Sequence, residues 1–152
     1  MKHTDTSTWP CNIARSVSIL GDRWNVLLIR QACLGIRRFE QFQHTLGIGR
    51  NILTNRLNTL VDEGVFDRVG YQTNPTRSEY RLTDKGRDAY TVLASMDAWG
   101  RRWLAGPEGT PVLLNHLPCG SDMHAVVVCS ECREPLDVRQ VTARTSVSTI
   151  TC

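Results

Sequence analysis

The chain has 152 residues and a mass of 17.1 kDa, with 41% hydrophobic residues, 22% charged residues and a formal net charge of +3. This length suits one domain or one domain with an appendage, and the hydrophobic share excludes a wholly disordered chain. No apolar run approaches the roughly 18 residues that span a membrane, and the opening residues do not resemble a signal peptide. We therefore expect a cytoplasmic protein.

The basic residues are almost all arginine, because 16 of the 18 are Arg and two are Lys. Arginine binds phosphates and guanine edges through two parallel hydrogen bonds. Residues 1–106 hold 15 basic and 10 acidic groups, a balance of +5, whereas residues 107–152 hold three basic and five acidic groups, a balance of −2. The excess of positive charge in the first segment suits a nucleic-acid partner.

Three helices are predicted at the amino end of the chain. Apolar residues at helical spacing indicate the first over residues 12–20, and Gly21 ends it. Asp22 is placed to cap a second, mostly buried helix over residues 23–34. A third, short helix fits residues 38–46.

The fourth predicted helix, over residues 50–62, carries an unusual polar face. Leucines repeat on one side, and uncharged amide and hydroxyl side chains repeat on the opposite side. Amides and hydroxyls lower helix propensity but can pair with base edges. The face is therefore either a DNA-reading surface or a polar face that happens to be rich in Asn. The leucines are Leu53, Leu57 and Leu60, and the polar residues are Asn51, Thr54, Asn55 and Asn58.

A turn and a hairpin flank this helix. The tight turn at residues 47–49 joins the third and fourth helices into a helix-turn-helix. Residues 66–69 and 79–82 predict two strands, joined by a polar loop over Gly70–Ser78. This hairpin would form a wing, from which Arg77 could reach a minor groove or a phosphate.

A long helix over about residues 84–103 follows the wing, and its apolar stripe suits packing against a second copy or against its own core. The order of elements predicts a mainly α fold with a small β-hairpin wing, a winged helix-turn-helix, over residues 1–106. A small β-rich appendage would occupy residues 107–152. The apolar stripe consists of Val92, Met96, Trp99 and Trp103.

Motifs spread over about residues 11–103 carry a family resemblance. They are Cys11, ILGDRW at 19–24, RFEQF at 38–42, LTNRL at 53–57, LVDEG at 60–64 and YRLTDKG at 80–86. In this order and spacing the chain resembles the HxlR-type family of bacterial winged helix-turn-helix transcriptional regulators. The resemblance implies a homodimer that binds a pseudo-palindromic operator in double-stranded DNA.

The resemblance also implies roles for individual residues. The helix at about Arg50–Asp62 would enter the major groove, and the wing at about Gly70–Ser78 would lie on the minor groove or backbone. Arg38 would contact phosphate, and Arg77 would act from the wing. Arg56 lies off the polar face, so it contacts phosphate or forms a structural salt bridge. The residues expected to face the major groove are Arg50, Asn51, Thr54 and Asn55.

Two cysteines lie within the winged-helix segment. Cys11 comes where the first helix begins, and the positive end of the helix dipole favours a reactive thiolate there. Some members of the family use such a cysteine to sense oxidants, which makes Cys11 a candidate redox sensor; the alternative is packing against a partner. Cys33 is expected in the core, and Cys152 has no assigned role.

The appendage contains a metal-binding pattern. His116-x2-Cys119 and Cys129-x2-Cys132 bracket nine residues, and the strand-like run 126–128 leads into the second pair. Two such pairs at the turns of a short hairpin suit a structural zinc ion. His124 is a competing fourth ligand. The alternative is a metal-free ribbon whose cysteines are reduced or disulfide-linked.

The sequence thus predicts a dimeric regulator of transcription that needs no cofactor to bind DNA and that responds to a small molecule or an oxidant. The alternative is a zinc-ribbon protein-interaction module without specific DNA binding, in which the helices only dimerise. An enzyme is excluded because no Ser/His/Asp set, glycine-rich phosphate loop or carboxylate pair stands at a suitable spacing.

Overall fold

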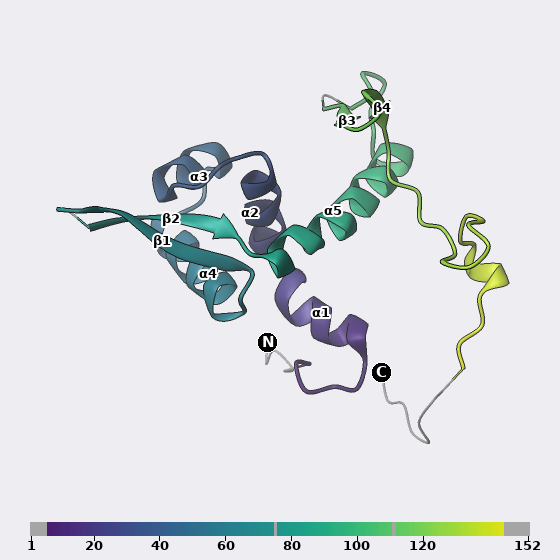
Figure 1. Cartoon of the computed structure of the whole chain (residues 1–152), viewed down its shortest axis with the longest axis horizontal. Helices are drawn as coiled ribbons and strands as arrows, with labels where there is room; N and C mark the ends of the chain where they lie inside the picture. The colour runs from purple at the N-terminus through teal and green to yellow at the C-terminus, as the bar shows by residue number, and fades with distance from the viewer. Residues whose placement is uncertain (1–5, 75, 111, 145–152) are drawn as a thin grey trace. The chain divides into compact units, whose positions relative to one another are not determined.

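A computed structural model describes residues 6–74, 76–110 and 112–144 (Figure 1). The chain divides into two compact units, of which the first runs to Tyr90 and the second spans Thr91–Arg144. None of the described helices is long and apolar enough to cross a membrane. The boundary predicted near residue 106 lies beyond the last long helix and stays a prediction.

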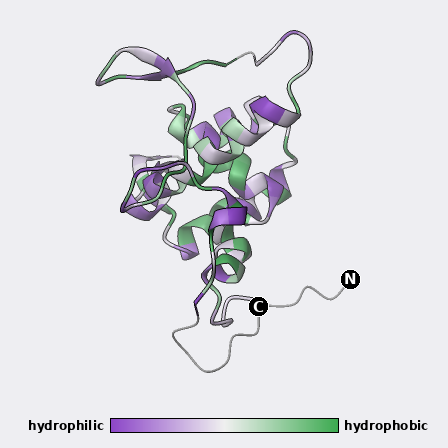
Figure 2. Ribbon diagram, turned by 90° about the vertical axis from the view of Figure 1, so that its right-hand side faces the viewer, coloured by the Kyte–Doolittle hydropathy of each residue, from purple (hydrophilic) through white to green (hydrophobic). Residues whose placement is uncertain are grey.

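Four helices precede the hairpin in the first unit, and all four predicted helices are confirmed. Figure 2 colours the ribbon by hydropathy and shows hydrophobic and hydrophilic residues mixed within its helices. They are α1 (Asn12–Leu20), α2 (Arg23–Cys33), α3 (Phe39–Leu46) and α4 (Arg50–Asp62).

Local hydrogen bonds set the helix boundaries. Asp22 caps α2 as predicted, because its Oδ1 accepts the backbone N–H of Trp24 at 2.8 Å. At the start of α3 the side-chain oxygen of Gln41 accepts the backbone N–H of Arg38 at 3.1 Å. Gly47 ends α3 with a φ of 60°, a left-handed conformation that disfavours side chains with a Cβ.

The wing is an antiparallel pair of β1 (Phe66–Thr73) and β2 (Thr76–Leu82), in which Phe66 lies opposite Leu82. The prediction of a polar loop over Gly70–Ser78 was wrong, because the strands continue through most of it. A bulge between Gly70 and Gln72 interrupts the register. The side chains of β1 beyond Phe66 are exposed, so no alternation of apolar residues marks this part as strand.

The core of the first unit lies between α2, α3, α4 and the base of the hairpin. Phe66 is central, because its ring centroid lies 6.3 Å from that of Phe42 and 6.4 Å from that of Tyr80. The same core buries side chains from α2 and α4 almost completely. These are Leu28, Ile29, Leu53, Leu57 and Leu60.

Helix α5 (Asp84–Trp103) begins in the first unit and ends in the second. Its start is capped by Thr83, whose hydroxyl accepts the backbone N–H of Gly86 at 3.1 Å. Gly86 lies so close to the preceding loop that a Cβ on it would stand 2.2 Å from the carbonyl oxygen of Val65. The turn before this helix therefore requires glycine at position 86.

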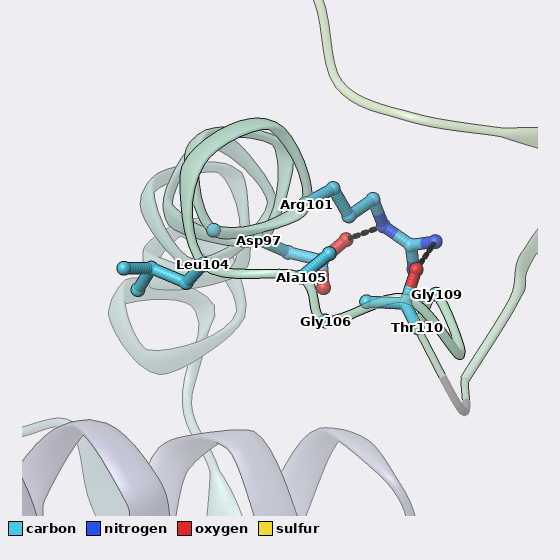
Figure 3. Close-up of a pocket in the computed structure, with 8 residues that line it drawn as sticks. Asp97, Arg101, Leu104, Ala105, Gly106, Gly109 and Thr110 are labelled. Carbon is cyan, nitrogen blue, oxygen red and sulfur yellow. Dashed lines mark hydrogen bonds and ion pairs between the residues drawn. The ribbon is translucent and has the colours of Figure 1, made fainter.

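The second unit contains two short strands and one 3₁₀ helix after α5. Arg101 joins α5 to the loop that follows, since it contacts Asp97 at 2.5 Å and the hydroxyl of Thr110 at 2.9 Å (Figure 3). The expected strand at residues 126–128 is wrong, because only an isolated bridge from Val128 to Pro135 forms there. The regular elements are β3 (Leu114–His116), β4 (Ser121–Met123) and η1 (Val138–Gln140).

Candidate nucleic-acid interface

A rigid turn sets the angle between α3 and α4. Gly47 reverses the chain, Ile48 is buried, and Gly49 occupies the position before the first residue of α4. Because Ile48 anchors the turn in the core, the two helices are held as a helix-turn-helix pair. The predicted motif is therefore present at the predicted residues.

Helix α4 exposes the polar face that its sequence predicts. Three leucines of α4 are fully buried, whereas the amide and hydroxyl residues of the opposite face are exposed. The hydroxyl of Thr54 donates to the carbonyl of Arg50 at 2.9 Å, so its polar atom is satisfied within the helix. Within the described residues the side-chain amides of Asn51 and Asn55 make no hydrogen bond to protein, which leaves both available to a ligand.

One exposed residue of this helix was missed by sequence reasoning. Ile52 is 46% exposed on α4 and follows Asn51 directly. Apolar side chains contact the methyl group of thymine in the major groove. The available signal was its position, which lies outside the row of Leu53, Leu57 and Leu60.

Two arginines predicted to contact DNA stack on aromatic rings. The guanidinium of Arg50 lies 5.0 Å from the ring centroid of Phe39, and that of Arg38 lies 4.9 Å from the ring centroid of Tyr71. Tyr71 belongs to the wing, so the stacking ties the start of α3 to β1. A guanidinium held on a ring keeps its outer N–H groups for a phosphate and loses less side-chain entropy on binding.

The wing also hydrogen-bonds to the segment before α3. The backbone N–H of Tyr80 donates to the carbonyl of Arg37 at 2.8 Å. The Nε of Arg38 lies 3.5 Å from Oε1 of Glu79. The hairpin is thus fixed against the helix-turn-helix at its base.

Glu79 is a second residue that sequence reasoning missed. Hydrogen bonding from the Arg81 guanidinium, with a smaller contribution from Arg38, holds the pKa of the Glu79 carboxyl below its usual value. The carboxylate therefore stays charged and offsets part of the positive charge of Arg38 in the free protein. No sequence pattern indicated this, because Arg38 and Glu79 lie 41 positions apart in the chain.

The remaining predicted contacts have distinct surroundings. Arg56 forms a salt bridge to Asp22 at 3.0 Å, which is one of the two roles predicted for it. Arg77 is exposed on β2 near the tip of the wing. At that tip the amide of Gln72 donates to the carbonyl of Asn74 at 3.0 Å. These positions leave the phosphate contacts of Arg56 and Arg77 as predictions.

Two apolar surfaces outside the helix-turn-helix are exposed. On α1, Ile13 is 75% exposed and Val17 is 55% exposed, so this helix turns apolar side chains away from the core. On α5 the predicted stripe is exposed along its whole length. It comprises Val92, Met96, Trp99 and Trp103, with Trp103 62% exposed.

The cysteines occupy different environments. Cys11 is half-buried at the residue before α1, with extended backbone. Cys33 is half-buried in α2 rather than fully in the core, and desolvation raises the pKa of its thiol. Cys152 lies outside the described residues.

In the second unit, hydrogen bonds surround the thiols of the two His/Cys pairs. The Nδ1 of His116 lies 3.3 Å from the Sγ of Cys119. A backbone hydrogen bond from Ser121, followed by a side-chain hydrogen bond from His116, lowers the pKa of Cys119 to about 7. Backbone hydrogen bonds from Cys132 and Glu131 lower that of Cys129. Among the described residues no three His, Cys, Asp or Glu side chains form one group that could hold a metal, so zinc stays a prediction.

The fold and the exposed face of α4 define a winged helix-turn-helix, the architecture of DNA-binding transcriptional regulators. The family model described as HxlR-like helix-turn-helix matches residues 19–107. The chain belongs to this family and is an HxlR-type transcriptional regulator, not an enzyme.

The chain is similar to regulators from several bacteria. It is 41% identical over 131 residues to the HTH-type transcriptional regulator Rv3095 of Mycobacterium tuberculosis, covering 86% of this chain and 83% of that protein. The crystal structure of PA1607, for which a role as a transcription factor has been suggested, matches with a TM-score of 0.83 at 32% identity and covers 93% and 99% of the two chains. The redox regulator HypR in its oxidized form matches with a TM-score of 0.56 at 28% identity, covering 60% of this chain and 96% of that one.

Proposed function

We propose that the protein binds a pseudo-palindromic operator as a homodimer, with α4 of each copy in a major groove and the wing on the adjacent minor groove or backbone. The observation that carries the proposal is the surface of α4. It presents two amides without protein partners, an exposed isoleucine and a stacked arginine on a helix whose other side is buried in the core.

The amides supply the sequence preference in this proposal. Asn51 and Asn55 lie four residues apart and therefore on one face of α4. An asparagine amide can accept from N6 and donate to N7 of adenine, a pair that discriminates against a wrong base by about 1–3 kcal/mol. Thr54 and Ile52 add apolar contacts, because the hydroxyl of Thr54 is already bonded within the helix.

The arginines supply the affinity that does not depend on sequence. Arg38 is stacked and half-exposed at the start of α3, Arg50 begins α4, and Arg77 is on the wing. Each phosphate contact releases a counterion, so binding should weaken steeply as salt rises. The carboxylate of Glu79 limits this attraction at Arg38.

Dimerisation is supported by the apolar residues that the described chain leaves exposed. The stripe on α5 and the apolar residues of α1 are large side chains in water, which monomeric proteins rarely arrange in rows. A second copy is the occupant that the pseudo-palindromic operator requires. Sedimentation of the wild type against Met96→Glu tests this, since a charge in the stripe should yield monomers.

A comparison of two variants tests the mode of DNA binding. Asn55→Ala should weaken operator binding about 5- to 150-fold, the range that corresponds to 1–3 kcal/mol, and should leave binding to a scrambled duplex nearly unchanged. Arg77→Ala should weaken both. Mobility shifts on the two duplexes at several salt concentrations provide the measurement. Equal losses on both duplexes for Asn55→Ala would contradict base reading by α4.

The same salt series separates this proposal from a protein-interaction module that does not bind DNA specifically. A regulator loses DNA affinity linearly on logarithmic axes as salt increases. A protein-interaction module should show no DNA affinity that varies with salt. His116 and Cys119 variants should leave the DNA result unchanged, because they lie outside the residues proposed to contact DNA.

Redox control through Cys11 is a second proposed function, supported by its position before α1 and by the similarity to HypR. The positive end of the helix dipole stabilises a thiolate at such a position. At neutral pH Cys11 should therefore react with iodoacetamide faster than Cys33, whose thiol is held in the neutral form by burial. Equal alkylation rates of the two residues, measured by mass spectrometry, would argue against a sensor.

A further inference from the structure

Two Cys/His pairs in the second unit are built on similar tight turns. In the first, the backbone N–H groups of Cys119 and Gly120 donate to the carbonyl of His116 at 3.1 and 2.8 Å, at the turn between β3 and β4. In the second, the N–H of Arg133 donates to the carbonyl of Cys129 at 3.0 Å. Each turn therefore brings the first and last member of a x2-spaced pair close together.

The residue after each pair has a left-handed backbone. Gly120 has a φ of 67° and Arg133 has a φ of 64°. Among the described residues, Arg133 is the only one other than glycine with a positive φ. This conformation is unfavourable for a side chain with a Cβ and persists where the surroundings require it. The second turn therefore has the same left-handed backbone conformation as the first, but it is locally strained because the residue in that conformation is arginine rather than glycine.

The first pair already has the spacing of two ligands on one metal ion. In a tetrahedral site with Zn–N of 2.0–2.1 Å and Zn–S of 2.3 Å, the two donor atoms lie about 3.6 Å apart. The observed separation of Nδ1 of His116 and Sγ of Cys119 is 3.3 Å. Little movement of these side chains is needed for both to bind the same ion.

The segment around the pairs has no core of its own. Of the described residues between 105 and 144 none is buried, and Leu117 and Val138 are 88% and 87% exposed. A segment of about 40 residues without buried apolar side chains needs a metal, a disulfide or a partner to hold a fold. The pairs offer the donors for the first of these.

The chain between the pairs allows them to meet. No helix or strand occupies residues 124–127 in the described structure, whereas β3–β4 lies before them and the Val128–Pro135 bridge after them. A site that joins the two pairs requires rotation about the backbone of residues 124–126, because the carbonyl of Val127 accepts the N–H of Leu136 at 3.0 Å and ties Val127 to the second turn. The structure itself leaves the two pairs in separate groups.

We propose that His116, Cys119, Cys129 and Cys132 of one chain bind a single Zn²⁺ ion in a tetrahedral site. Three thiolates and one neutral imidazole are a donor set that suits zinc. On binding, the three thiols release three protons to solvent and no electron is transferred. The site then carries a net charge of −1, and His116 binds through Nδ1 with its proton on Nε2. His124 stays outside the site.

Metal analysis of the full-length protein tests this proposal. Protein purified without chelator, or incubated with zinc sulfate and desalted, should contain about one zinc per chain. The double variant Cys129→Ser/Cys132→Ser and the single variant His116→Ala should lose it, whereas His124→Ala and Cys33→Ala should keep it. His116→Cys should retain zinc, because a fourth thiolate completes the same site. Cobalt substitution should give thiolate-to-cobalt absorption in the wild type and none in the double variant.

The outcomes separate the proposal from its alternatives. Mobility shifts with operator DNA report whether each variant still folds, independently of the metal. Absence of zinc from reduced, zinc-incubated protein overturns the proposal, as does a full equivalent of zinc in the double variant. A Cys129–Cys132 disulfide that survives in freshly purified protein also overturns it. Restored zinc after mixing His116→Ala with the double variant would show that two chains share the ion, which contradicts a site within one chain.

Discussion

The close approach of Gly86 to Val65 leads to a stability prediction. In the Gly86→Ala variant the new Cβ would lie 2.2 Å from the carbonyl oxygen of Val65 and 2.9 Å from Cδ2 of Leu82. The carbonyl cannot move freely, because the N–H and hydroxyl of Thr83 both hydrogen-bond to it, at 3.1 and 3.2 Å. The substitution therefore forces apart the start of α5 and the loop before β1.

The expected change in the free energy of unfolding combines two destabilising effects and one stabilising effect. Overpacking of this kind costs about 1–3 kcal/mol, and a weakened hydrogen bond to Val65 adds about 0.5–1.5 kcal/mol. Alanine in place of glycine within a helix regains about 1 kcal/mol. The net expectation is a loss of about 1–3 kcal/mol, or a fall in melting temperature of roughly 4–8 °C for each kcal/mol.

Gly100→Ala is the matched control, because Gly100 lies in the same helix and, apart from its chain neighbours and the nearby backbone of the helix itself, no atom stands within 4 Å of its Cβ position. It should be neutral or stabilise the protein by up to about 1 kcal/mol. Urea unfolding followed by circular dichroism measures both variants. If Gly86→Ala is as stable as Gly100→Ala, the steric account of the turn before α5 is refuted.

Two further substitutions test contacts of the first unit. Asp22→Ala removes both the cap of α2 and the salt bridge to Arg56 and should lower the free energy of unfolding by about 1–2 kcal/mol. Asp22→Asn keeps the cap and should cost less than about 1 kcal/mol, because the salt bridge is partly exposed. Similar urea midpoints for the two variants would contradict the capping role. The pKa of Glu79 is lowered in the folded state, so its contribution to stability is present above an unfolded pKa of about 4.3 and is lost as pH falls through the lower folded value. Glu79→Gln should therefore flatten the decline of melting temperature below about pH 4. By releasing Arg38 it should also strengthen binding to scrambled DNA. An unchanged pH profile of the melting temperature would show that Arg81 and Arg38 do not stabilise the carboxylate.

Much of the first unit was predictable because local interactions decide it. Helical spacing of apolar residues, the cap at Asp22 and the glycines at 47 and 49 depend on neighbours within one turn, and the bounds of α4 agree with the prediction. The HxlR-type family was also recognisable from motifs along the chain. The wing was less predictable because the side chains of β1 beyond Phe66 are exposed, so hydrogen bonding across the hairpin rather than burial of an apolar face decides the outer parts of the strands.

The amino-acid sequence by itself thus determined the helices, the exposed polar face of α4 and the class of protein, since each follows from side chains close together along the chain. The tertiary structure alone decided which groups meet across long separations. It paired Arg56 with Asp22, placed Arg38 between Tyr71 and Glu79, and left Gly86 without room for a side chain. Such contacts depend on the packing of whole elements against one another, and residues more than 20 positions apart carry no local signal of it.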